Sequence, residues 1–225
     1  MSPPRAAKRA PGTKKALPRV VAPPIPAPPA SSLNELRDDA RSCKACPLWK
    51  PATQTVFGEG PDRSSVMLVG EQPGDQEDIV GRPFVGPAGK LLDRALAEAG
   101  IDRSVLYVTN AVKHFKFEPR GKRRLHKKPN DAEIDACLRW LERELELLTP
   151  QVVVALGATA ARALLGRATP IGVNRGKLLD FTENAKLLIT VHPSFLLRVP
   201  EEYKAQEYKN FVEDLKVVAR LLRRP

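Results

Sequence analysis

Four short runs of apolar residues recur along the chain, and each of them ends in a polar or glycine-rich segment. They are SVMLVG (65–70), VLYVTN (105–110), QVVVALG (151–157) and KLLITVH (186–192). Near-continuous apolar runs of this length are typical of strands that are buried on both faces of a parallel sheet. The pattern therefore predicts four such strands.

Longer segments with helical spacing of apolar residues lie between and after these runs. They cover residues 86–100, 130–148, 158–166 and about 201–223. In the second of them, Asn130 can cap the helix and Glu133 can return the bond. Its apolar side carries Ile134, Leu138, Leu141, Leu145 and Leu148. A shorter helix is predicted after Ser32, a suitable N-cap. This alternation predicts a three-layer α/β/α sandwich around a central four-stranded parallel sheet.

The first 32 residues differ in composition from the rest of the chain. They include nine prolines and six basic residues but no acidic residue. Such a segment cannot bury enough apolar surface to offset the entropy lost on ordering, so we expect a disordered tail over 1–32. The remaining residues, 33–225, are numerous enough to form one domain with a full hydrophobic core.

The net charge of +11 is concentrated in that tail and in residues 113–128, which carry eight basic side chains and one acidic one. The rest of the chain is close to neutral. This distribution indicates a polyanionic partner at one face of the molecule, in the first place nucleic acid. The alternative is a solvated basic loop without a partner.

No apolar run approaches the ~20 residues that a membrane-spanning helix needs, and no signal-peptide pattern is present, so a cytoplasmic location is expected. The chain has three cysteines, Cys43, Cys46 and Cys137. They are too few for a disulfide framework. In a reducing compartment a C-x-x-C pair with a later cysteine indicates a metal or cluster site.

Ligands of open parallel sheets bind beyond the carboxyl ends of the strands, and three of the predicted strands end in residues with useful chemistry. The first leads into GEQPGDQEDIVGRPFVGPAG (70–89), which lacks the phosphate-loop pattern and whose carboxylates would repel a phosphate. Phe84 in this segment offers a face for a planar ring, or it is an ordinary core residue. Asn110 ends the second strand with a donor and an acceptor that suit a base edge. His192 follows the fourth, where a structural role is the alternative.

GEQPGDQED, VTNAVKH and VHPS, each at the end of a predicted strand, resemble the motifs of the uracil-DNA glycosylase superfamily in its iron–sulfur branch. The resemblance covers about residues 41–220. GEQPGDQED together with KRRLH resembles the X-type (UdgX) members, which become covalently attached to uracil-containing DNA. The resemblance implies that Phe84 stacks on the flipped uracil, that Asn110 reads its N3/O4 edge and that His192 bonds O2. Main chain near Gln72 would complete the pocket.

The same resemblance implies a [4Fe–4S] cluster with a structural role. Cys43, Cys46 and Cys137 match three of the branch's four cysteine positions, and His114 stands where the fourth is expected. Histidine is a known ligand of cluster iron, although a less usual one than cysteine. A Cys₃His set also suits zinc, which is the alternative.

The stretch GKRRLHKKPN (121–130) places His126 in a predicted loop among cations. Neutral imidazole is a better nucleophile than water, so we expect His126 to attack C1′ of the sugar and to remain attached to it. Glu71, Gln72 and Asp75 are candidates for electrostatic and hydrogen-bond support. The loop's basic residues are expected to hold DNA phosphates; they are Arg120, Lys122, Arg123, Arg124, Lys127 and Lys128.

Two other interpretations remain open at this point. In the first, the chain is a conventional multiple-turnover uracil-DNA glycosylase and His126 only contacts DNA. In the second, it is a non-catalytic zinc or cluster protein that binds nucleic acid. For the glycosylase we expect a monomer that prefers single-stranded DNA, because one loop closes over the substrate.

Overall fold

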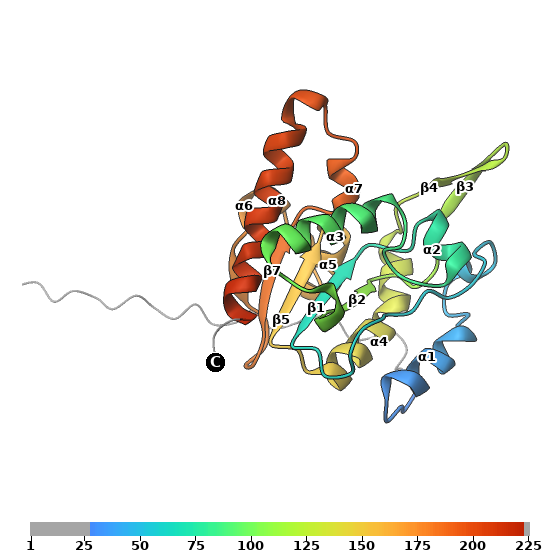
Figure 1. The fold of residues 1–225 in the computed structure, drawn as a ribbon. Helices are drawn as coiled ribbons and strands as arrows, with labels where there is room; N and C mark the ends of the chain where they lie inside the picture. Colours follow the sequence, from blue (N-terminus) through green and yellow to red (C-terminus); the bar gives the residue numbers. More distant parts are fainter. Residues whose placement is uncertain (1–27, 223–225) are drawn as a thin grey trace, which may run out of the picture.

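The computed structural model describes residues 28–222, and its centre is a five-stranded sheet in the order β2-β1-β5-β7-β6 (Figure 1). Four of the strands run parallel: β1 (Val66–Gly70), β2 (Tyr107–Asn110), β5 (Val152–Leu156) and β7 (Lys186–Thr190). All four lie in the predicted apolar runs. The predicted α/β/α sandwich is confirmed, with one strand more than expected.

The additional strand, β6 (Leu178–Asp180), pairs antiparallel with β7 at the edge of the sheet. It has only three residues, and Leu178 and Asp180 are both exposed. Edge strands are commonly short and partly polar because an exposed apolar edge would pair with other chains. A segment of this kind has no continuous apolar run, which is why the sequence pattern did not predict it.

Helices cover both faces of the sheet (Figure 1). They are α1 (Leu33–Arg41), α2 (Asp75–Val80), α3 (Pro87–Ala99), α4 (Asp131–Leu148), α5 (Ala158–Leu165), α6 (Ile171–Asn174), α7 (Pro193–Leu196) and α8 (Glu201–Leu222), with 3₁₀ turns at Pro47–Trp49 and Arg103–Val105. Alternate residues of a strand point to opposite faces. Accordingly, Leu68 of β1 packs in one cluster with α3 and α8, whereas Met67 packs in the other with α1, α4 and α5.

The helix starts follow the residues that the sequence offers as caps. Ser32 Oγ accepts the Glu35 N–H at 3.2 Å at the start of α1. At the start of α4, Asn130 Oδ1 accepts the Glu133 N–H at 2.9 Å, and Glu133 Oε2 accepts the Asn130 N–H at 2.7 Å. The predicted capping box is therefore confirmed, and of the five apolar residues predicted to share one side, only Leu145 is less than fully buried.

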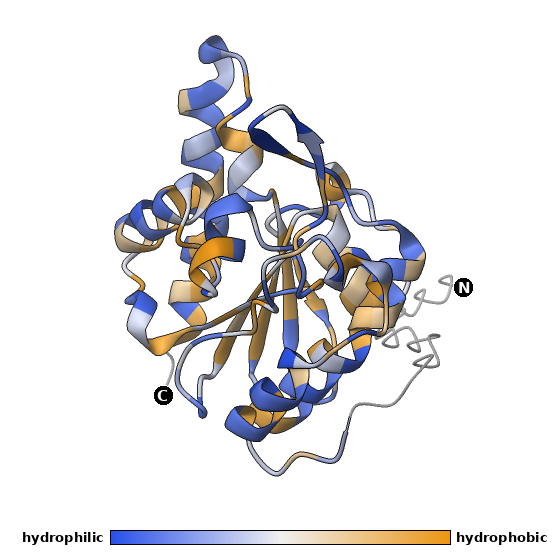
Figure 2. Cartoon of the chain, turned by 90° about the vertical axis from the view of Figure 1, so that its right-hand side faces the viewer, coloured by the Kyte–Doolittle hydropathy of each residue, from blue (hydrophilic) through white to orange (hydrophobic). Residues whose placement is uncertain are grey.

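The segment predicted as a basic loop is a β-hairpin, so that prediction was wrong. β3 (Phe117–Arg120) and β4 (Arg123–His126) pair antiparallel around the two-residue turn of Gly121 and Lys122. Gly121 has φ 59°, the left-handed backbone that such a tight turn requires and that glycine adopts at low cost. The hairpin projects from the body of the domain (Figure 1), and it is hydrophilic, whereas the central strands are hydrophobic (Figure 2).

Most of the predicted tail, residues 1–27, lies outside the described part of the chain. Ala30 is buried in the core cluster that α1, α4 and α5 form with the sheet, and its carbonyl accepts a hydrogen bond from Arg143 of α4. The folded domain therefore includes at least Ala30, slightly before the predicted boundary. Within residues 28–222 no helix is both long and apolar enough to span a membrane.

Candidate active site

Phe84 and Asn110 come together at the carboxyl end of β1, where Gly70 leaves space for both. Gly70 pairs in register with Asn110 of β2. A Cβ at Gly70 would lie 2.3 Å from Asn110 Oδ1 and 2.6 Å from Phe84 Cζ. No side chain fits at that position without displacing one of the two. The glycine at this strand end is thus a condition for the close approach of Phe84 and Asn110.

Phe84 is held in an unusual backbone conformation. Its φ is 55°, in the left-handed region that a bulky residue enters only when its surroundings impose it. Gly89 packs directly against it, since a Cβ there would lie 1.8 Å from the Phe84 carbonyl oxygen. The Phe84 ring centroid lies 5.8 Å from that of His192. Phe84, Asn110 and His192, from three separate segments, therefore face one site.

Asn110 carries a buried acceptor without a donor. The residue is 2% exposed, and its Oδ1 has no hydrogen-bond partner within the described residues. Leaving a buried polar atom unpaired costs about 1–3 kcal/mol, so such atoms usually mark a place where a ligand or water completes the bond. A ligand that fits here presents an N–H to Asn110.

His192 is a neutral hydrogen-bond donor in this site. It caps α7, where its Nδ1 accepts the Ser194 N–H at 3.1 Å and lies 2.8 Å from Ser194 Oγ. Because the Nδ1 lone pair is used, the ring proton is on Nε2. Burial lowers the pKa of His192 to about 4, so the imidazole is uncharged at neutral pH. Nε2–H can then donate to a carbonyl oxygen.

This low pKa predicts that His192 makes folding sensitive to acid. An unfolded histidine takes up its proton near pH 6.5, whereas folded His192 does so only near pH 4. Its contribution to stability is therefore complete above pH 6.5 and is lost as the pH falls toward 4, up to about 3 kcal/mol. Urea unfolding between pH 7 and pH 4 should show a smaller loss for His192→Gln than for wild type. Equal losses would contradict the assignment.

Glu71 connects the sheet edge with the hairpin. Its Oε2 accepts a hydrogen bond from Thr159 Oγ1 of α5 at 2.5 Å, and its Oε1 lies 3.2 Å from His126 Nε2. Burial alone would raise the pKa of Glu71, but the hydrogen bonds from His126 and Thr159 outweigh it and bring the pKa below its ordinary value. Glu71 is therefore a carboxylate that touches His126, whose side chain is 46% exposed.

Gln72 has a different role from the one expected. Its side-chain Nε2 donates to the carbonyls of Lys116 and Lys127, both at 3.1 Å, and its Oε1 accepts the Lys116 N–H at 3.2 Å. Lys116 and Lys127 flank the two hairpin strands. The Gln72 amide thus holds the base of the hairpin against β1. The sequence analysis expected this side chain to support the reaction, but its amide is already used by these hydrogen bonds.

Arg124 and Asp75 also differ from expectation, because they bind each other. Arg124 Nε donates to Asp75 Oδ1 and its Nη1 to Asp78 Oδ2, both at 2.6 Å. The guanidinium also lies over the rings of Phe115 and Phe117, 5.5 and 5.1 Å from their centroids. Asp75 therefore neutralises Arg124 instead of facing His126, and Arg124 fixes the hairpin instead of presenting its charge to DNA.

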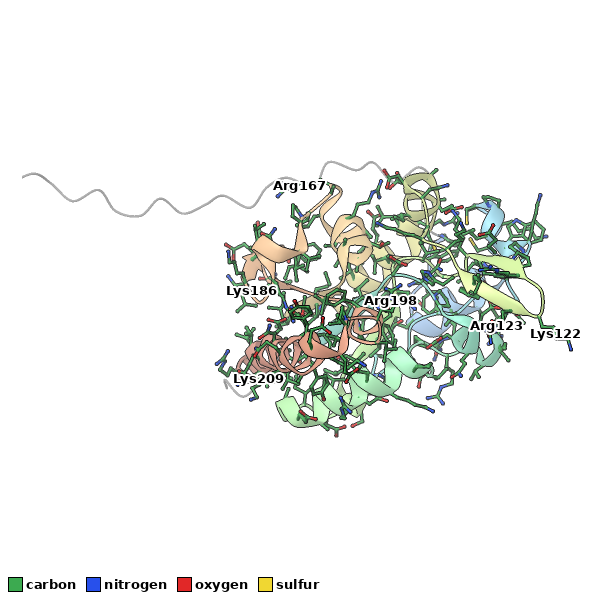
Figure 3. The ribbon with its side chains drawn as sticks, turned by 90° about the horizontal axis from the view of Figure 1, so that it is seen from above. Lys122, Arg123, Arg167, Lys186, Arg198 and Lys209 are labelled. Carbon is green, nitrogen blue, oxygen red and sulfur yellow. The ribbon has the colours of Figure 1, made fainter. Side chains whose placement is uncertain are left out.

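The other predicted DNA contacts are on the surface of the hairpin and its flanks. Arg120, Lys122, Arg123 and Lys128 are exposed. Lys127 is exposed too, but it pairs with Glu118 at 2.9 Å. Figure 3 shows Lys122 and Arg123 at the outer end of the hairpin. The hairpin thus carries cations on its outside and His126 at its inner end.

The three cysteines gather between the end of α1 and the middle of α4. The pKa of the Cys46 thiol is raised and that of Cys137 is raised to about 12, mainly by burial and to a smaller extent by the neighbouring cysteines. Two N–H groups point at the sulfurs: the Trp140 indole at Cys43 Sγ and the Lys113 amide at Cys137 Sγ, each at 3.2 Å. Such donors stabilise thiolate ligands of a metal centre.

His114 is buried and follows Lys113, whose amide contacts Cys137. Its Nε2 lies 3.0 Å from the Thr55 hydroxyl. Burial lowers the pKa of His114, which favours the neutral form that binds metals. In residues 28–222, no three His, Cys, Asp or Glu side chains are grouped so as to hold a metal ion.

Comparison with known proteins identifies the family. The family model "Uracil DNA glycosylase superfamily" matches residues 57–216. The chain belongs to the uracil DNA glycosylase superfamily. It is 39% identical over 175 residues to the type-4 uracil-DNA glycosylase of Pyrobaculum aerophilum, covering 75% of this chain and 86% of that one. The type-4 enzyme of Thermotoga maritima is 42% identical over 159 residues, covering 70% and 79%.

The similarity extends to another group of the superfamily. The type-5 uracil-DNA glycosylase of Thermus thermophilus is 34% identical over 140 residues, covering 56% of this chain and 59% of the relative. The predicted membership of the superfamily is confirmed. The X-type subdivision and the roles of individual site residues stay predictions.

Three residues of the candidate site were missed from the sequence. Thr159 supports Glu71, Asp78 binds Arg124, and Phe115 lies 6.2 Å from the His126 ring. Thr159 follows the third predicted strand, where ligands of a parallel sheet are expected, but its residue type gave no role. For Asp78 and Phe115 no such signal exists, because their contacts depend on how the hairpin folds back over α2.

Proposed function

We propose that this chain excises uracil from DNA. The support is the family, the type-4 glycosylase relatives and the chemistry of the pocket. Uracil N3–H can donate to the unpaired Asn110 Oδ1, and the Asn110 amide can donate to O4. His192 Nε2–H can donate to O2, and the Phe84 ring offers a face for the base. These groups stabilise the negative charge that uracil acquires when the bond from N1 to C1′ breaks.

We further propose that His126 then captures the sugar. The observation that carries this step is the 3.2 Å approach of His126 Nε2 to the Glu71 carboxylate beside the pocket. The electron pair of the broken bond leaves with uracil N1, and an imidazole lone pair forms the new bond to C1′. The ring becomes a cation, and Glu71 stabilises both the sugar cation and this imidazolium. Uracil is protonated from solvent on release.

The hairpin explains how DNA would be brought to this histidine. Arg120, Lys122, Arg123 and Lys128 are the exposed cations proposed to bind phosphates on either side of the extruded nucleotide. Gln72 holds the base of the hairpin and Arg124 holds its outer part against α2, so phosphate binding at the hairpin positions His126 as well. We propose a monomer that prefers single-stranded DNA, in which the base is extruded without disrupting a pair.

The direct test is the intact mass of the protein after incubation with a uracil-containing oligonucleotide. The proposal predicts one new species of protein plus oligonucleotide minus uracil, stable to denaturation. A conventional glycosylase would instead give free uracil, unmodified protein and many turnovers. A non-catalytic binding protein would give neither free uracil nor a covalent product.

We also propose that Cys43, Cys46, Cys137 and His114 hold a [4Fe–4S] cluster. Three buried or partly buried cysteines with N–H donors on two of the sulfurs fit such a group. His114 fits through its ring nitrogen Nδ1, since Nε2 contacts Thr55. When bound, the cluster would join α1, α4 and the segment after β2, and the glycosylase reaction needs no electron from it.

Protein purified without air should therefore be brown and absorb near 400 nm. Removal of the iron by a chelator should lower the melting temperature, because the cysteine segment would lose its link to α4. Replacing Cys137 by Ser should abolish the absorbance, whereas Ser at the exposed Lys44, which lies between Cys43 and Cys46, should leave it unchanged. A colourless wild-type protein with bound zinc would contradict the cluster.

A further inference from the structure

A fully buried ion pair lies directly behind Asn110. Lys113 and Glu144 have no exposed side-chain surface, and Lys113 Nζ lies 2.6 Å from Glu144 Oε2. The ammonium also donates to Thr109 Oγ1 at 2.6 Å and to the main-chain carbonyl of Asn110 at 2.8 Å. Its three protons thus have three acceptors. One of them is the backbone of the residue whose side chain faces the pocket.

The carboxylate of this pair is equally well satisfied. Glu144 Oε1 accepts hydrogen bonds from the Tyr107 and Thr109 hydroxyls, both at 2.9 Å. Gly58 packs against the same groups, since a Cβ there would lie 2.3 Å from the Tyr107 hydroxyl. A dry polar network in which every member is paired allows one arrangement only, because any shift leaves a buried group unpaired. Within this network, the group that fixes where the Asn110 backbone lies is the Lys113 ammonium, which alone contacts it.

Both main-chain polar groups of Lys113 are hydrogen-bonded. Its N–H donates to Cys137 Sγ at 3.2 Å, and its carbonyl accepts the Val56 N–H at 2.8 Å. Between Asn110 and Lys113, the Ala111 N–H donates to the Gly70 carbonyl at 2.9 Å. The turn after β2 is thus held against β1, α4 and the segment at Val56 that precedes β1. A displacement of Lys113 would be transmitted to Asn110 within three residues.

Stability alone does not account for this pair. A buried ion pair repays the cost of removing two charges from water only in part, and apolar residues of similar volume are often as stable or more so. The pair lies against the core, with the Phe57 ring centroid 5.3 Å from Lys113 Nζ, so apolar side chains at these two positions would meet apolar surroundings. What an apolar contact would not provide is a directed donor to the carbonyl of Asn110.

We propose that Lys113, through its ion pair with Glu144, is a positioning residue for the uracil-reading amide of Asn110. The proposal rests on uracil excision as the function. Misplacing a reading group by about 1 Å costs on the order of 10²-fold in rate. Lys113 touches neither substrate nor reacting atoms, and its effect on the reaction passes through Asn110.

The test is the double variant Lys113→Met/Glu144→Gln, which removes both charges and keeps an amide for the Tyr107 and Thr109 hydroxyls. It should fold, with circular dichroism like that of wild type. Its affinity for free uracil, measured by competition in the excision assay, should fall at least about tenfold, and single-turnover release should slow by about 10- to 100-fold. Affinity for uracil-free DNA should not change, because the hairpin cations are untouched.

Tyr107→Phe is the matched control for a purely structural effect. It removes one hydrogen bond to Glu144 and no contact of Lys113 or Asn110. It should lower the melting temperature while uracil affinity stays at the wild-type value. If the double variant does not fold, Glu144→Gln alone should show a smaller loss of uracil affinity in the same assay. A folded variant of either kind that binds uracil as wild type does would overturn the positioning role, whereas a wild type that neither binds nor releases uracil would overturn the proposed function itself.

Discussion

The His126→Ser variant should release uracil from DNA without forming a covalent product. A serine hydroxyl is shorter than imidazole and is not a nucleophile without a base to activate it, so water would reach C1′ instead. We expect the adduct to fall from the main product to undetectable, while single-turnover uracil release stays within about tenfold, because the pocket is unchanged. Denaturing gels would measure the adduct, and a uracil-release assay would show repeated turnover.

The matched control for this variant is Lys128→Ser, which removes an exposed cation two residues away. It should keep the adduct and weaken only DNA affinity, most visibly at higher salt. If His126→Ser still gave a product that survives denaturation, another residue would be the nucleophile. If both variants lost the adduct equally, the shared cause would be poor DNA binding and not the loss of the imidazole.

The strands of the core could be predicted because burial on both faces requires apolar residues at successive positions, and such a run is visible in the sequence itself. Val66–Gly70 and Val152–Leu156 are apolar at every position, as burial on both faces demands. The hairpin was missed for the opposite reason. Its strands are exposed and polar, and only the glycine at its two-residue turn signals it. What makes it fold is mainly contact with β1 and α2, through Gln72 and Arg124, which a linear pattern does not contain.

The same distinction applies to the site. Phe84, Asn110 and His192 come together because the topology brings the segments that follow parallel strands to one edge of the sheet. Asp75 and Arg124 were assigned separate roles from their charge, yet each is the other's partner. Charge counts in a sequence show how many ions a segment carries, but not which of them already have a partner within the fold. Only the cations left unpaired after folding are available to DNA.

The Glu71→Gln variant should release uracil more slowly by about 10²- to 10³-fold, the usual cost of losing one preorganised electrostatic contact at a developing charge. Glutamine has the same shape and can still accept the Thr159 hydroxyl, so the fold and the position of the side chain should persist. What disappears is the negative charge, which the low pKa of Glu71 maintains in wild type, and with it the stabilisation of the sugar cation. Single-turnover release with excess protein measures this step.

Asp75→Asn is the appropriate control, because it also neutralises one carboxylate in the segment after β1. Since Asp75 binds Arg124 and not His126, its loss should leave release within a few-fold of wild type and should mainly loosen the hairpin. Adduct formation should therefore fall with release in Glu71→Gln, but fall alone in Asp75→Asn. If the two variants showed the same profile, Glu71 would act only by holding the hairpin, and the charge beside the sugar would have to come from elsewhere.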